Sequence, residues 1–108
     1  MHTTNTSVLT RRVWIRSDYA TLPYEAGWAT EAVFFTQVEG EHPDLTITTD
    51  ISPDGINWIA RGEPRTLRSD ETIAESSLTT FGNWVRLRVE GASEEQPARI
   101  LVHVNLKG

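Results

Sequence analysis

Apolar and polar residues alternate along most of this chain, which is the spacing of β-strands that bury one face. No segment keeps the 3.6-residue apolar period of an amphipathic helix. The alternation predicts about eight strands, separated by Gly, Pro and acidic residues at intervals of roughly 8–12 residues. They are residues 7–17, 31–40, 44–52, 56–61, 65–69, 71–78, 83–91 and 98–108. This pattern predicts an all-β fold, a single antiparallel β-sandwich of jelly-roll type.

A chain of 108 residues is long enough for one hydrophobic core and too short for two. We expect residues 7–108 to form the β-sandwich domain. Residues 1–6 are polar and are expected to form a flexible N-terminal arm. The one long irregular segment is 18–30, DYATLPYEAGWAT, which carries three aromatic residues.

The charge balance argues against a nucleic-acid binder. The chain has 10 basic and 15 acidic residues, a net charge of −5, and no basic run that could neutralise a phosphate backbone. All of the basic residues except Lys107 are arginines. Arg is enriched and Lys depleted at protein interfaces, so the composition favours protein–protein contact.

Cysteine is absent, so the sequence predicts neither disulfides nor thiolate chemistry. The N-terminal residues MHTTNTSVLT contain no apolar segment of signal-peptide length. No window approaches the ~18 apolar residues of a membrane span. We therefore expect no membrane partner and a soluble protein that is made and kept in a cytoplasm, or released from one by lysis.

The stretch DISPDGINW, residues 50–58, combines two carboxylates, a turn and a tryptophan. Pro53 presets φ for the first corner, and Gly55 accepts the left-handed conformation of a bulged hairpin. A structural turn is the interpretation we favour. Asp50 and Asp54 are also candidate calcium ligands, although calcium needs about six converging oxygens. Trp58 is also a candidate for stacking on a sugar.

The order of these elements resembles small tailed-phage and prophage virion proteins. The segments that carry the resemblance are VEGEHPDLTITTDISPDGINW at 38–58, NWVRLRVEG at 83–91 and ARILVHVNLKG at 98–108. The hairpin with S-x-D-G-x-x-W is also similar to that of galactose-binding-like, discoidin-type sandwiches. Those domains are longer and usually joined by a disulfide, so this second resemblance is weaker. The first implies a structural protein of a virion.

No catalytic, metal or cofactor site is predicted. His2, His42 and His103 lack metal-ligand spacing, and a zinc site without Cys would need all three or help from carboxylates. The serines lack a nucleophile-elbow context, and there is no Gly-rich phosphate loop. We therefore expect no enzymatic activity.

In two predicted strands the alternation turns Val13 and Ile15, and Val85, Leu87 and Val89, toward the core, and it leaves Arg and Trp on the outward faces. These residues are Arg12, Trp14 and Arg16 on one strand and Trp84, Arg86 and Arg88 on the other. If the strands are neighbours, guanidinium groups stack on indole rings across the sheet. That arrangement is either an intramolecular ladder or a subunit interface, because Trp and Arg most often carry interface energy. A carbohydrate platform is a third interpretation of the same face.

The function that the sequence and the resemblance favour is a structural assembly subunit of a phage or phage-like particle: a capsid decoration, head–tail or tail component. Its expected partners are copies of itself or other virion proteins, assembled in the host cytoplasm. Acidic residues are concentrated in the loops 39–44, 69–71 and 90–97, whereas most arginines lie on strands. This segregation suggests a head-to-tail contact, in which the acidic loop of one subunit meets the Arg-bearing sheet of the next. The alternative is a carbohydrate-binding module, in which a glycan stacks on aromatic side chains. The candidates for that stacking are Tyr19, Tyr24, Trp28 and Trp58.

Overall fold

A computed structural model describes residues 4–108 of the chain. Within these residues all regular structure is β-strand, and no helix is long and apolar enough to cross a membrane. The strands are β1 (Thr4–Ile15), β2 (Tyr19–Ala20), β3 (Tyr24–Glu25), β4 (Glu31–Glu39), β5 (Leu45–Ser52), β6 (Ile59–Leu67), β7 (Ile73–Thr79), β8 (Trp84–Glu90) and β9 (Ala98–Lys107). The expected all-β fold is confirmed.

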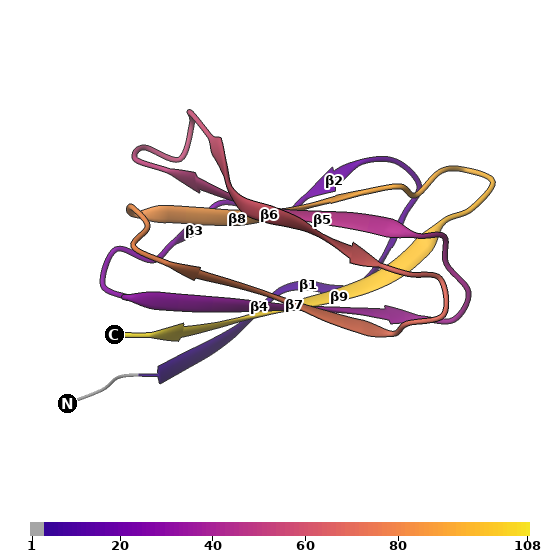
Figure 1. Ribbon diagram of the computed structural model, residues 1–108, viewed down its shortest axis with the longest axis horizontal. Coiled ribbons are helices and arrows are strands. Elements are labelled where there is room, and N and C mark those ends of the chain that lie inside the picture. Colours follow the sequence, from indigo (N-terminus) through magenta and orange to yellow (C-terminus); the bar gives the residue numbers. More distant parts are fainter. Residues whose placement is uncertain (1–3) are drawn as a thin grey trace.

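The strands form two antiparallel sheets that lie face to face (Figure 1). The first sheet has the order β1-β9-β4-β7, and the second has the order β2-β8-β5-β6. Strand β3 also pairs with β8, so β2 and β3 together act as one interrupted edge strand. Counted in this way, eight strands fill two sheets in jelly-roll order.

Strand pairs are nested about the middle of the chain. The pairs are β5 with β6, β4 with β7, β8 with both β2 and β3, and β1 with β9. Partners such as Ile51 and Ile59, or Phe34 and Ser76, lie almost symmetrically about Gly55. The chain is therefore one long hairpin, folded back at residues 52–58 and then wound into two layers.

The core lies between the sheets and follows the predicted alternation. On β8, Val85, Leu87 and Val89 are fully buried, as the sequence indicated. On β9 the buried residues are Ile100, Val102, Val104 and Leu106. Phe34, also fully buried, fills the centre from β4. Because strands show period two, every second side chain of these strands faces outward and is available for other roles.

Two tyrosines close one open side of the sandwich. The Tyr19 hydroxyl, on β2, shares a hydrogen bond of 2.8 Å with the Thr10 hydroxyl on β1. The Tyr24 hydroxyl, on β3, shares one of 2.7 Å with the Ser7 hydroxyl, also on β1. The interrupted edge strand of the second sheet is thereby joined to the edge strand of the first.

Two arginines close the opposite side. Arg61 on β6 donates hydrogen bonds of 3.2 and 2.9 Å to the carbonyl oxygens of Thr79 and Thr80. Arg65 donates one of 3.0 Å to the carbonyl oxygen of Glu75 on β7. These carbonyl groups would otherwise be open on an edge strand, where they invite pairing with another chain.

Strand β1 differs most from expectation. Residues 4–6, expected in the flexible arm, form the start of β1 and pair with residues 105–107, because β9 offers backbone partners to polar residues. Residues 1–3 lie outside the described part. Register shifts between Val8 and Val13, with Arg12 at φ 47°, form a bulge that breaks the alternation. Val13, predicted to face the core, is consequently 41% exposed, whereas Ile15 is buried.

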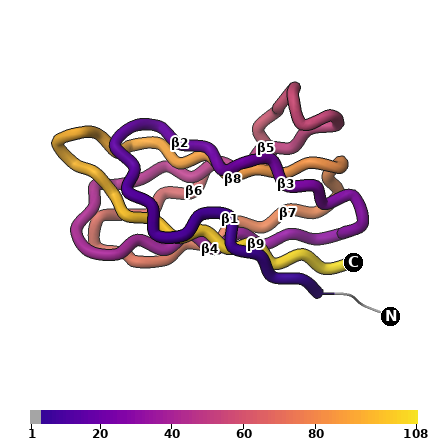
Figure 2. Tube along the Cα trace, turned by 180° about the vertical axis from the view of Figure 1, so that it is seen from behind, coloured from indigo at the N-terminus to yellow at the C-terminus, as the bar shows by residue number. Residues whose placement is uncertain are grey.

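The two ends of the sandwich differ in chemistry. The start of β1, the end of β9 and the 52–58 fold-back lie at one end (Figures 1 and 2). The acidic connections 40–44, 68–72 and 91–97 gather at the other. The acidic loops that the head-to-tail hypothesis invokes therefore cluster at one end of the molecule.

We predict that Gly91→Ala destabilises the fold more than Gly40→Ala does. A Cβ at Gly91, where φ is +120°, would lie 2.5 Å from the carbonyl oxygen of Asp44, whereas one at Gly40, where φ is +77°, meets nothing within 4 Å. Gly40→Ala should cost about 1 kcal/mol, the penalty of a left-handed backbone. Gly91→Ala should cost at least roughly twice that. Urea unfolding measures both; equal costs would contradict the close approach of these loops.

Candidate functional site

The two Arg/Trp strands singled out in the sequence lie in different sheets. Arg12, Trp14 and Arg16 belong to β1 and the bend after it, at the edge of the first sheet. The other group belongs to β8, inside the second sheet. The six residues therefore form two separate surfaces rather than one ladder. The sequence could not assign strands to sheets, and the condition for a shared ladder, that the two strands are neighbours, is not met.

The group on β8 surrounds a buried carboxylate. Asp50 on β5 pairs with Arg86 in the sheet register, and its side chain is only 2% exposed. Its Oδ2 accepts a hydrogen bond of 2.8 Å from Arg86 Nε and one of 2.7 Å from Arg88 Nε. Arg88 also contacts the Glu90 carboxylate at 3.4 Å. The charges of Asp50 and Glu90 thus neutralise those of Arg86 and Arg88 on the outer face of the second sheet.

Tryptophans extend this Asp50 network. The Cζ of Arg86 lies 4.4 Å from the ring centroid of Trp58, a cation–π distance. Trp84 lies beneath the fold-back, since a Cβ on Gly55 would be 3.3 Å from its ring. Trp58 and Trp84 therefore hold the 52–58 loop against the sheet.

The Asp50 network is electrostatically strong. The hydrogen bond from Arg88 to Asp50 raises the pKa of the Arg88 guanidinium, although burial alone would lower that pKa. Oδ1 of Asp50 is also buried and has no hydrogen-bond partner within residues 4–108. A buried carboxylate is stable only with such charged partners, so Arg86 and Arg88 are needed to stabilise the fold.

Asp54 organises the fold-back itself. Its carboxylate accepts the backbone N–H of Ile56 at 2.9 Å and that of Asn57 at 2.8 Å, with the Asn57 amide at 2.8 Å and the Ser52 hydroxyl at 3.0 Å. The hydrogen bonds from Asn57 and then Ile56 hold the pKa of the Asp54 carboxyl well below its usual range. The favoured structural interpretation of DISPDGINW agrees with this geometry.

The structure does not assemble the calcium or sugar alternatives for this stretch. The carboxylate of Asp50 lies under two guanidinium groups, and that of Asp54 is used by its own loop. Trp58 is covered on one face by Arg86. Within residues 4–108, no group of three or more His, Cys, Asp or Glu residues is placed to hold a metal ion.

The remaining sugar-stacking candidates are also dispersed. Tyr19 and Tyr24 are half-buried in the seam between the sheets, with their hydroxyl groups bonded to β1. Trp28 is 43% exposed, and the C-terminal Gly108 packs against its ring. These aromatic side chains close the sandwich and do not line a shared groove.

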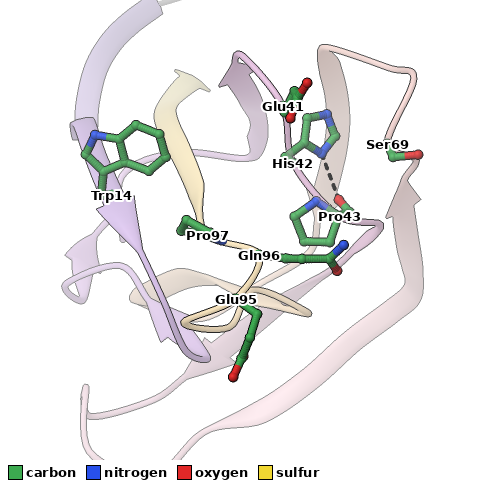
Figure 3. A pocket seen from close by; sticks show the side chains of 8 residues that line it. All are labelled: Trp14, Glu41, His42, Pro43, Ser69, Glu95, Gln96 and Pro97. Atoms are coloured by element: carbon green, nitrogen blue, oxygen red, sulfur yellow. Dashed lines mark hydrogen bonds between the residues drawn. The ribbon is translucent and has the colours of Figure 1, made fainter.

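The acidic end carries an open hollow of about 590 Å³. Trp14 stands on one side of it and His42 and Ser69 on the other, with Gln96 and Pro97 between them (Figure 3). The Nδ1 of His42 lies 2.7 Å from the carbonyl oxygen of Pro43, and its Nε2 lies 2.7 Å from that of Glu71. His42 therefore ties two loops together and is not free to act as a ligand.

Comparison with family models identifies the class of domain. The model described as "Domain of unknown function (DUF6385)" matches residues 27–108, which contain β4–β9. The chain belongs to the DUF6385 family. Comparison with curated protein sequences finds no match.

Solved structures support the fold of this DUF6385 chain. The PBSX exported protein XepA is similar over 94% of this chain, with a TM-score of 0.73 and 10% identity. A chain from the structure of infectious bursal disease virus, Gx strain, is similar over 98%, with a TM-score of 0.55 and 12% identity. The DUF6385 chain spans only 36% and 32% of the lengths of those two chains. At such identities the likeness concerns the fold.

Sequence reasoning missed the partner of the β8 arginines. Asp50 was considered only as a calcium ligand, although it occupies the polar face of a central strand, where a lone carboxylate needs a cation. An Arg-x-Arg pair on another strand was the signal for that cation. Arg61 and Arg65 were missed because their acceptors are backbone groups, which no side-chain pattern reveals.

We predict that the stability given by Asp54 is lost in acid. Because its pKa in the folded state is depressed, its contribution is complete above the unfolded value of about 3.9 and disappears as pH falls below it. Asp54→Asn should therefore be less stable than the natural chain at pH 7, with a difference that shrinks toward pH 2. Urea midpoints at both pH values measure this. The control is Asp70→Asn, in an exposed loop; an Asp54→Asn difference independent of pH would contradict the assignment.

We predict an asymmetric cost for breaking the Asp50 network. The double variant Arg86→Met with Arg88→Met leaves a buried carboxylate without a cation, which should cost about 3–5 kcal/mol. Asp50→Asn should cost less, about 1–2 kcal/mol, because the guanidinium side chains are 25% and 33% exposed and reach water.

The control for these variants is Arg65→Met. Arg65 and its partner Glu75 are 54% and 55% exposed, so the change should cost no more than about 1 kcal/mol. Unfolding free energies from urea titration rank the variants. A double variant as stable as the control would show that Asp50 does not need its arginines.

Proposed function

We propose that this chain is a non-enzymatic structural subunit of a phage or phage-like particle, acting through protein–protein contacts. The proposal is supported by the jelly-roll fold, which it shares with a chain of a virus structure and with the exported protein XepA. The resemblance of its strand and hairpin segments to virion proteins points the same way. A position as capsid decoration, head–tail or tail component, reached by assembly in the host cytoplasm, belongs to the same proposal.

The way in which the chain uses its polar groups carries the proposal. Asp50, Arg86 and Arg88 neutralise one another, and Asp54 caps its own loop. Apolar side chains, in contrast, remain outside. They are Val8, Val13, Trp14, Leu22, Trp28, Ile56, Ile59 and Ile73. A surface of this kind is suited to contact with other proteins rather than to chemistry on a small substrate.

The six candidate contact residues fall into two groups, which differ in how free their side chains are. Trp14, 47% exposed, remains available for a partner, and Arg12 and Arg16 lie beside it on the first sheet's edge. Arg86 and Arg88 are held by Asp50, and Trp84 lies under the fold-back. We therefore propose that the assembly surface lies on the first sheet.

Carbohydrate binding is the second candidate. The hollow at the acidic end favours it, since Trp14 stands there with Glu95 and Gln96, an aromatic ring beside polar groups. This candidate uses Trp14 in place of the four aromatic residues selected from the sequence.

The test is to locate the chain in the organism that encodes it. After phage induction, particles are purified on a density gradient and probed with an antibody against the chain. We expect the chain to band with the particles, while an abundant cytoplasmic host enzyme, as control, does not. A chain found only at the top of the gradient would contradict the proposal. Glycan binding abolished by Trp14→Ala would then favour the second candidate.

A further inference from the structure

The outer face of the first sheet carries few charges at its centre, where Val8, Val33, Phe35, Ile73 and Leu101 lie among polar residues. Its cross-strand rows follow from the register, running from β1 through β9 and β4 to β7. The central rows are Thr6–Asn105–Val33–Ser77, Val8–His103–Phe35–Glu75 and, beyond the bulge of β1, Leu101–Gln37–Ile73. Only Glu75, at the margin, brings a carboxylate into these rows, and Arg65 pairs with it.

Charges of both signs gather at the two ends of this face. Lys107 lies beside Glu31 at one end. At the other end Arg99 lies between Trp14 and Glu39, and Arg12 donates a hydrogen bond of 2.7 Å to Glu39. A centre depleted of charged residues, with charges at the rim, is the usual anatomy of a protein interface. Each end carries both signs, so the face is complementary to a rotated copy of itself.

The other surfaces of the sandwich are less suited to a second copy. The outer face of the second sheet is occupied by the Asp50 network. On the edges, Arg61 and Arg65 cover carbonyl groups of β7, Pro64 and the positive-φ Gly62 lie within β6, and the bulge distorts β1. The acidic end repels its like in a chain of net charge −5. Leu22, Ile56 and Ile59 are exposed, but they lie on loops and at the start of an edge strand. The outer face of the first sheet remains.

We propose that this face binds the same face of a second copy of the chain, sheet against sheet about a two-fold axis. The inference rests on the proposed function, since it names a partner for the assembly surface. Four strands about 4.8 Å apart and five rows about 7 Å apart give a face of roughly 600 Å². Two such faces bury about 1,200 Å², the lower limit of stable interfaces, so dissociation is expected in the micromolar range.

Sedimentation equilibrium from micromolar to millimolar concentration tests this proposal. The mass of the natural chain should rise from 12.2 kDa toward twice that value. Phe35→Arg places a charge at the centre of the face and should raise the dissociation constant at least tenfold. Leu101→Glu, in the neighbouring row, gives an independent second variant. High salt should not dissociate the dimer, because the centre of the face carries few charges.

The matched control is Ile56→Arg on the fold-back loop, where the isoleucine is 78% exposed and lies outside the face. It should leave the dissociation constant unchanged; circular dichroism shows which variants are folded. A natural chain that stays monomeric at millimolar concentration, or a dimer insensitive to both face variants, would overturn the inference. A monomer that bands with particles, but no longer does so as Phe35→Arg, would leave the proposed function standing and assign the face to a different protein.

Discussion

The fold depends on one reversal of the chain at residues 52–58. Four sets of strand pairs are nested about that reversal: β5 with β6, β4 with β7, β8 with β2 and β3, and β1 with β9. The loop has a fixed shape because Asp54 binds two backbone N–H groups and Gly55 takes a positive φ. A shift of one residue there would turn the apolar face of each strand to solvent, so the turn sets the register of the whole sandwich.

Charge neutralisation separates the two faces of the molecule. On the second sheet, the carboxylate of Asp50 binds Arg86 and Arg88, and Trp58 covers Arg86. That face holds its own loop in place and has few free groups. On the first sheet the same alternation leaves Phe35, Leu101 and their neighbours outward, with charges only at the margins. The sequence alternation is similar in both sheets, and the difference arises from the polar residues that cross-strand pairing brings together.

The sequence predicted those features that depend on neighbours along the chain. Period two located the core residues of β8 and β9, and Pro53–Gly55 located the reversal. It could not predict the sheet of each strand, because pairing partners lie up to a hundred residues apart. It therefore left open whether the two Arg/Trp strands are neighbours, and they lie in different sheets. The bulge at Arg12 escaped because a non-glycine residue at positive φ has no sequence signal. Tyr19 and Tyr24 proved to be seam residues for the same long-range reason.

We propose that this protein acts by contact through the outer face of its first sheet. The most direct test is a dilution series of amide proton–nitrogen NMR spectra. We predict concentration-dependent shifts that map to β4 and β9, around Phe35 and His103, while the amides of residues 53–58 stay fixed. Spectra that do not change with concentration, or changes confined to the 53–58 loop or to the hollow beside Trp14, would contradict this proposal.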